Sequence, residues 1–326
     1  MEIIQYCPLV RTLDRDTVLR LAATKWAEIA SFQPELATSA GLQQQLLTIV
    51  LDAAETLKDE PLHVLTQASI AAKWARGVPA LHNEPIAIPP RLKDALRPLC
   101  TVLAEGGAGD SALHIRDALL TGSIDADSLL RVSLARNPAA MRTSALHMGF
   151  SPDLLWLIGE LGSSPLAYRL ASAIDDGRRE NGVGCDFPVG PGKITPDPIF
   201  EWDRGYCPCC GSWPVLIEAT ADLHTLRCSY CTLGWRLRSR RCVYCGHSGD
   251  RFIIAAPDPA SSERTLELCG ACGGYTKVIR VETATPFPLL AVDDLATMDL
   301  DRGAMERGYG RPEMFDVSAI EPFRSC

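Results

Sequence analysis

Eight cysteines in the second half of the chain form four pairs with Cys-x-x-Cys spacing. They are Cys207 with Cys210, Cys228 with Cys231, Cys242 with Cys245, and Cys269 with Cys272. Two thiolates on one tight turn can bind the same cation, and a second such turn completes a tetrahedron with metal–sulfur distances of about 2.3 Å. Taken in chain order, the pairs predict two metal sites, each with four cysteine ligands.

The two predicted sites repeat one pattern. Seventeen residues separate Cys210 from Cys228 and 23 separate Cys245 from Cys269, and each gap can hold one β-hairpin. Three of the turns have a glycine after their second cysteine, where a positive φ lets backbone N–H groups point at the sulfurs (Gly211, Gly246 and Gly273). The pattern is typical of zinc-ribbon or rubredoxin-like knuckles. A cross-braced pairing of the four turns is also compatible with the spacing.

The donor set limits the chemistry of these sites. Four thiolates leave no open coordination position, which favours a structural metal contributing on the order of 10 kcal/mol to folding. An all-sulfur tetrahedron suits zinc, and it also suits a rubredoxin-like iron that cycles between two oxidation states. The residue types alone leave iron and zinc open.

The other cysteines and the nearby histidines are weaker candidates. Cys209 lies inside the first turn, where the second copy of the repeat has no cysteine, so we expect a spare buried thiol, with replacement of Cys210 as the alternative. We expect no role for the scattered Cys7, Cys100, Cys185 and Cys326. Because eight sulfurs already fill both sites, His224 and His247 are interpreted as surface residues.

Arginines follow the second cysteine pair as Arg236, Arg238, Arg240 and Arg241, which raises the hypothesis of nucleic-acid binding. Residues 202–282 contain ten Lys or Arg and eight Asp or Glu, and eight thiolates with two divalent ions add four negative charges. The metal-bound region would then carry a charge of about −2, which argues against nucleic acid as a partner. We expect these arginines to offset the thiolate charge, to face solvent or to contact a partner protein.

Bulk properties favour an ordinary globular protein of two or three domains. The chain has 326 residues, is 47% hydrophobic and carries a formal net charge of −8. Its N-terminus lacks a basic region followed by an apolar run, and its longest apolar stretch is too short to span a bilayer. A cytoplasmic location with reduced thiols is therefore expected rather than a disulfide framework.

The expected fold class is α+β, with the metal sites after a helical half. Apolar residues three and four positions apart predict an all-helical domain over residues 1–180, and a Gly/Pro-rich linker is expected at 181–201. Period-two alternation then predicts hairpin strands in two tandem β modules, at 202–240 and 241–285. A closing helix is expected within 290–312, with Asp293 or Asp294 near its N-cap.

From Trp202 to about residue 310 the chain resembles the FdhE family, the formate dehydrogenase accessory proteins. The resemblance depends on a series of motifs in order: Cys207-Pro208-x-Cys210-Gly211-Ser212 with Pro214, Arg227-Cys228-x-x-Cys231 with Trp235, Cys242-x-x-Cys245, Cys269-x-x-Cys272 with Tyr275 and Lys277, and Asp293-Asp294-Leu295-Ala296 with Gly308-Tyr309. Cys209 departs from the family pattern. The helical half is similar to the family in layout only.

The resemblance implies a cytoplasmic accessory or maturation factor that binds the catalytic subunit of a respiratory formate dehydrogenase before its export. It also implies that the eight paired cysteines hold two rubredoxin-like irons and that the chain is not an enzyme. Two other classes remain as alternatives: a zinc-ribbon nucleic-acid-binding protein, and a thiol or iron redox protein. No thioredoxin-like βαβ unit, phosphate loop or Ser-His-Asp arrangement stands out in the sequence, and the oligomeric state is left open.

Overall fold

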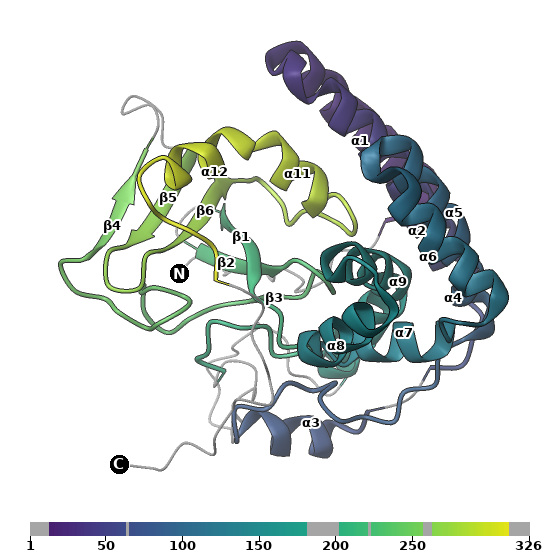
Figure 1. Ribbon diagram of the computed structural model, residues 1–326. Helices are drawn as coiled ribbons and strands as arrows, with labels where there is room; N and C mark the ends of the chain where they lie inside the picture. The colour runs from purple at the N-terminus through teal and green to yellow at the C-terminus, as the bar shows by residue number, and fades with distance from the viewer. Residues whose placement is uncertain (1–12, 63–64, 181–201, 221–222, 257–262, 313–326) are drawn as a thin grey trace. The chain divides into compact units, whose positions relative to one another are not determined.

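The computed structural model describes residues 13–62, 65–180, 202–220, 223–256 and 263–312 (Figure 1). They fall into two compact units. The helical unit contains the described residues of 13–63 and 83–170, and the sheet unit contains those of 64–82 and from 171 onward. The expected linker at 181–201 lies outside the described residues, as do Cys7, Cys185 and Cys326. The predicted domain bounds therefore stay a prediction.

The helical unit is built from amphipathic helices, as the apolar spacing predicts. Its elements are α1 (Arg15–Phe32), a short 3-10 turn (Pro34–Leu36), α2 (Ala37–Thr56), α4 (Pro90–Asp94), α5 (Leu96–Leu103), a π-helical turn (Ala104–Ala108), α6 (Gly109–Thr121), α7 (Ala126–Leu134), α8 (Pro138–Met148) and the first part of α9 (Pro152–Glu180). None of the helices among the described residues is both long and apolar enough to cross a membrane.

Short polar residues start several of these helices. The Asp14 side chain accepts a hydrogen bond from the backbone N–H of Thr17 at 2.9 Å, and Asn137 does the same for Ala140 at 3.0 Å. These contacts satisfy N–H groups that have no partner inside the helix. Pro138 and Pro152 occupy first-turn positions, where a missing N–H costs nothing.

The sheet unit contains one six-stranded sheet in the order β3-β2-β1-β6-β5-β4. The strands are β1 (Pro214–Thr220), β2 (Leu223–Cys228), β3 (Gly234–Trp235), β4 (Phe252–Ala255), β5 (Arg264–Cys269) and β6 (Gly274–Arg280). Neighbouring strands are antiparallel except at the centre, where β1 runs parallel to β6 with Ile217 opposite Val278. The fold class expected from the sequence is confirmed. The structure adds that the two β modules share one sheet.

Joining the modules removes two exposed edges. Before they meet, β1 and β6 would each present unpaired backbone groups, and their pairing satisfies those groups and buries the side chains beside them. All the described residues of β1 up to Ala219, and those of β6 up to Ile279, are buried. A two-stranded hairpin is marginal in water, so each module gains stability from the other.

Two helices cover one face of the sheet, α11 (Leu290–Ala296) and α12 (Met298–Met305) (Figure 1). Leu300 and Ala304 of α12 pack with Leu266, Leu268 and Tyr275 in one apolar cluster. Leu290 of α11 packs with Val215, Leu216 and Ile279 in another. In the register of β5 and β6, Leu268 lies opposite Tyr275 and Leu266 lies opposite Lys277, so these residues share the face of the sheet that the helices cover.

The expectation of one closing helix with an aspartate at its N-cap is wrong. Asp293 lies inside α11, and the helix is interrupted at Thr297 before α12 begins. The Asp293 carboxylate accepts a hydrogen bond from the Thr285 hydroxyl at 2.9 Å, and the Thr297 hydroxyl donates to the Asp293 carbonyl at 2.8 Å. These contacts tie α11 to the loop after β6 instead of capping a helix.

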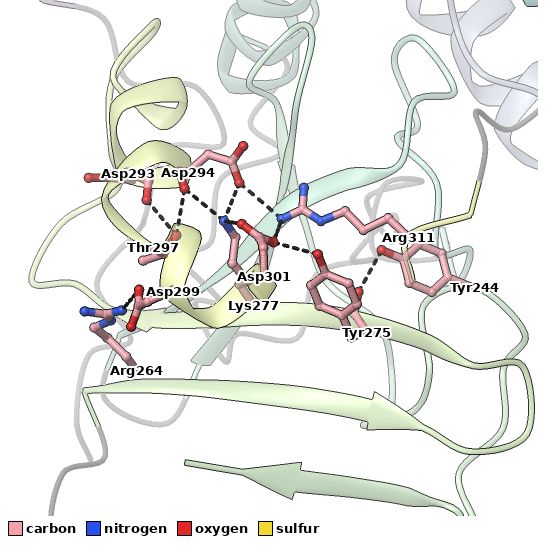
Figure 2. Close-up of polar contacts among 10 residues, drawn as sticks. All are labelled: Tyr244, Arg264, Tyr275, Lys277, Asp293, Asp294, Thr297, Asp299, Asp301 and Arg311. Atoms are coloured by element: carbon pink, nitrogen blue, oxygen red, sulfur yellow. Dashed lines mark hydrogen bonds and ion pairs between the residues drawn. The ribbon is translucent and has the colours of Figure 1, made fainter. Parts of the chain in front are cut away.

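Polar side chains hold the same two helices against β6 (Figure 2). The Lys277 ammonium is fully buried, and it lies 2.6 Å from an Asp294 carboxylate oxygen and 2.7 Å from one of Asp301. Arg311 contacts both of these carboxylates, and its guanidinium lies over the Tyr275 ring at 5.5 Å from the ring centroid. Two cations therefore balance two carboxylates between the sheet and the helices.

Candidate metal centres

The first centre brings together Cys207, Cys210, Cys228 and Cys231. Their sulfurs all lie within 4.8 Å of one another, with Cys207 and Cys231 at 3.6 Å and Cys210 and Cys228 at 3.4 Å. A tetrahedral metal with sulfurs at about 2.3 Å requires sulfur–sulfur separations of about 3.8 Å. The four thiols are buried and already stand close to that arrangement.

Backbone hydrogen bonds shape the turns of this centre. The Cys207 N–H donates to the Ser212 carbonyl at 2.8 Å, and the Gly211 N–H donates to the Cys207 carbonyl at 2.9 Å, with Gly211 at a φ of +88°. In the second turn the N–H groups of Tyr230 and Cys231 both point at the Cys228 sulfur at 3.4 Å. Donors aimed at sulfur stabilise a thiolate, as a metal ligand requires.

The second centre repeats this geometry with Cys242, Cys245, Cys269 and Cys272. Cys242 and Cys272 are 3.6 Å apart at sulfur, as are Cys245 and Cys269. Glycines with positive φ follow the second cysteine of each turn, Gly246 at +75° and Gly273 at +71°. Both groups therefore pair turns that are sequential in the chain, and the structure does not form the cross-braced alternative.

The two centres differ in exposure. All four thiols of the first are buried, whereas Cys245 and Cys272 of the second are exposed. In the first centre, desolvation by burial raises the pKa of the Cys207 and Cys231 thiols well above the ordinary value. In the second, burial also acts to raise the pKa of Cys269, but the N–H groups of Cys272 and Ala271 outweigh it together with hydrogen bonds from the Cys245 and Cys242 thiols, and that pKa falls to about 7.

The residues present fit a metal ion in both centres. Four clustered thiols without a cation would leave weak donors facing one another, and ionising them would place like charges a few ångströms apart. A divalent or trivalent cation removes that conflict and uses all four sulfurs. The donor set suits zinc or iron equally, so the identity of the metal is not determined by the geometry.

The weaker candidates lie outside both four-sulfur groups. Cys209 is buried, and its backbone carbonyl accepts a hydrogen bond from the Leu81 N–H at 2.9 Å. His224 and His247 are in neither group, although the His247 carbonyl accepts a hydrogen bond from the Cys242 N–H. Cys100 is buried in α5 of the helical unit, where burial raises the pKa of its thiol to about 11. A thiol with that pKa is unreactive at neutral pH.

A segment from far earlier in the chain supports the first centre. Helix α3 (Gln67–Trp74) and the residues after it belong to the sheet unit. The Trp74 indole N–H donates to the Pro208 carbonyl at 2.8 Å, the Ala80 N–H donates to the same carbonyl, and the Tyr206 hydroxyl donates to the Gly77 carbonyl. Sequence reasoning missed this support, although Gly77 and Pro79 do mark the end of the helix.

Comparison with known proteins gives related chains. No protein-family model matches the chain. It is 34% identical to the protein FdhE of Escherichia coli O127:H6 over 137 residues, which cover 41% of each chain. It is 36% identical to the FdhE homolog of Shewanella baltica OS185 over 111 residues, or 33% of this chain and 36% of that one. These matches span about two fifths or less of the relatives' length.

A solved structure extends the likeness to the whole fold. The crystal structure of the FdhE protein from Pseudomonas aeruginosa matches 94% of this chain and 96% of its own, with a TM-score of 0.53 and 18% sequence identity. The chain is similar to FdhE proteins in sequence over about two fifths of its length and in fold over most of it. The FdhE resemblance inferred from the ordered motifs is thereby confirmed. At 18% identity, the FdhE structure bears on the fold alone.

Proposed function

We propose that the chain is an accessory factor for the maturation of a respiratory formate dehydrogenase. The observation that carries the proposal is the combination of FdhE relatives with two four-cysteine groups that each have the geometry of a closed metal site. Accessory factors of this kind act by binding a client, and four-coordinate sulfur sites are suited to holding a fold together for that purpose. A role without catalysis is part of the same proposal.

The finer part of the proposal names the client protein, the cellular compartment in which it is bound and the metal. The chain binds the catalytic subunit of the dehydrogenase in the cytoplasm before that subunit is exported, and its eight paired cysteines hold two metal ions, with rubredoxin-like iron favoured over zinc. Bound iron would supply one-electron redox chemistry. The protein's own residues would keep the metals enclosed by thiolates, direct N–H donors at the sulfurs and, at the second centre, leave two sulfurs open to solvent.

A gene deletion with complementation tests the main proposal. Formate dehydrogenase activity should fall strongly in the deletion strain and return with the wild-type gene, but not with a variant in which Cys228 and Cys269 are both replaced by Ser. Cys209→Ala is the matched control, because it removes a neighbouring buried cysteine that lies outside the four-sulfur groups. Full activity in the deletion strain would contradict the proposal.

Two measurements test the finer part. A tagged catalytic subunit should copurify with the chain from the cytoplasmic fraction before export, and the exported enzyme should not. Anaerobic purification without added zinc, followed by elemental analysis and a visible spectrum, should give close to two irons per chain with thiolate charge-transfer bands. Two zincs in a colourless protein would reject iron while leaving the accessory role to the deletion experiment.

The exposed second centre favours one alternative, a thiol or iron redox protein. Accessible sulfurs can exchange electrons or thiols with a partner, which the buried first centre does not allow. That alternative requires turnover of a disulfide or an electron donor by the purified chain, with the turnover lost in Cys245→Ser. The accessory proposal expects no such turnover.

A further inference from the structure

Arginines of the segment that follows β3 gather at a hollow on the sheet unit. The hollow has a volume of about 230 Å³, and its lining includes His224, Arg236, Arg238, Arg240 and Arg241. Its apolar part comes from Ile217 of β1 and Leu226 of β2, which are opposite one another in the sheet, together with Leu237 and Val243. A chain with a net charge of −8 thus concentrates cations at one place.

Only part of this positive charge is compensated. Arg240 pairs with the buried Glu267 at 2.7 Å, and Arg241 pairs with Asp203 at 2.8 Å. Arg236 donates its Nε to the Thr225 hydroxyl. Within the described part of the chain, neither Arg236 nor Arg238 has a carboxylate at ion-pair distance. Two guanidinium charges therefore remain to attract an anion.

Arg238 lies where two hollows meet. It lines the first hollow and also a second one of about 360 Å³, which Trp74, Trp202 and Arg204 help to line. The Arg238 side chain is exposed, and its backbone N–H is fixed by a 3.0 Å hydrogen bond to the Asp203 carboxylate. The two hollows together are thus longer than the binding of a single small anion requires. The unpaired charge of Arg238 lies near their middle.

We propose that these two adjoining hollows, here called the arginine groove, bind an acidic peptide segment of a client protein. Guanidinium groups bind carboxylates through paired hydrogen bonds, and the apolar part of the lining suits the aliphatic side chains between them. A nucleic-acid strand would use the charge but not the apolar part. The tryptophans at the second hollow, Trp74 and Trp202, are buried and leave little ring face for a base to stack on. The proposal rests on the proposed function only in taking the occupant to be a client.

Peptide binding by the purified full-length chain tests the groove. The probe is a fluorescein-labelled octapeptide of alternating Glu and Leu, followed by fluorescence anisotropy at low salt, where charge pairing is least screened. Arg238→Glu should weaken its binding about tenfold or more, and Arg238→Gln should weaken it less. The matched control is Arg91→Glu, which makes the same charge change at an exposed arginine of the helical unit. That variant should bind as the wild type does.

Three outcomes would overturn the proposal. The first is an equal loss of affinity in Arg238→Glu and Arg91→Glu, which would mean that net charge alone governs binding. The second is equal affinity for a peptide with Gln in place of Glu. The third is tighter, Arg238-dependent binding of an octathymidylate, which would identify a nucleic-acid surface. None of these assays uses formate dehydrogenase. If one of these outcomes is found while the deletion strain still loses formate dehydrogenase activity, the arginine groove is rejected as a peptide site and the proposed accessory role is unaffected.

Discussion

The Lys277 ammonium lies 2.7 Å from the Asp301 carboxylate while having no exposure to solvent of its own. The charge of this lysine, which lies on strand β6, is thereby neutralised by a carboxylate of helix α12. Arg311 contacts both carboxylates and neutralises the charge that remains on the pair Asp294 and Asp301. Removing one member of such a set leaves an uncompensated charge away from water, which costs more than the net contribution of the pair itself.

Lys277→Met should therefore destabilise the sheet unit strongly. We expect a loss of about 3 kcal/mol in the free energy of unfolding, because Asp301 is mostly buried and would keep only Arg311 as a charged partner, beside the hydrogen bond from the Tyr275 hydroxyl. Urea denaturation at neutral pH measures the change. The double variant Lys277→Met/Asp301→Asn should recover part of the loss. A double variant less stable than the single one would show that the ion pair is not the cause.

Loss of the first metal centre should destabilise the whole six-stranded sheet. In Cys228→Ser, one metal should be lost, and hydrogen exchange should accelerate in β1 and β2 and also in β5 and β6, because β1 pairs with β6. Cys209→Ala should keep both metals and normal exchange. Unchanged protection of residues 264–280 in Cys228→Ser would mean that the two modules fold independently.

Metal should leave the second centre before the first. Cys245 and Cys272 are exposed, so a chelator can reach their metal directly, whereas the buried first centre must open locally. We expect two release phases that differ by about tenfold or more, since each 1.4 kcal/mol of opening free energy is a factor of about ten. A chromogenic chelator follows both phases. The fast phase should be missing in Cys245→Ser, and a missing slow phase instead would reverse the assignment.

Helix α3 should stabilise the first centre through one side chain. Trp74→Phe leaves the Pro208 carbonyl with one hydrogen bond fewer in a buried place, which should cost about 0.5–1.5 kcal/mol because the Ala80 N–H still donates to it. Chemical denaturation of the metal-bound protein measures it. Trp156→Phe, which removes a half-buried indole bond to Glu160, should cost less. Equal costs would argue against a special role for the Pro208 contact.

The stability of Arg240→Gln should depend on pH. Burial raises the pKa of the Glu267 carboxyl, and the Arg240 guanidinium opposes that rise. Without Arg240 the pKa rises further, so the folded state favours the protonated carboxyl. The contribution of the Glu267 carboxyl to stability is then fully present at pH values below its unfolded-state pKa. That contribution is lost as the pH increases through its folded-state pKa. The stability gap to wild type should therefore widen as the pH increases above about 4, the ordinary pKa of a glutamate in the unfolded chain. A gap that is independent of pH would contradict this.

Local patterns were sufficient for five of the six strands and for the turns, but the strand predicted at 235–239 is limited to β3, Gly234–Trp235. Alternation predicts a strand at Phe252–Ala255, which is β4, and the cysteine spacing predicts turns that the structure groups as two sets of four. The ligand role of those cysteines stays a prediction. The joint sheet was not predictable in the same way, because Ile217 and Val278 pair across 61 positions and nothing near either residue indicates the other.

Burial was harder to predict than spacing. The two cysteine repeats look equivalent in sequence, yet only the first is fully enclosed, since Trp74, Trp202 and neighbouring residues pack around its turn. The Asp293-Asp294 pair before a helical pattern indicates an N-cap by local rules. The structure instead uses Asp293 to hold the Thr285 hydroxyl, a contact between separate segments that a pattern of neighbours does not contain.

The pairing of Trp74 with Pro208 also sets an order for assembly on the ribosome. These residues are 134 positions apart, so at about 5–20 residues per second the nascent chain carries α3 for on the order of ten seconds before its docking partner is made. During that interval the Trp74 side chain has no turn to pack against. If the cysteine turns fold around a metal, its supply would determine how soon α3 is covered, and cells short of that metal would hold newly made chains longer in a form open to aggregation and proteolysis.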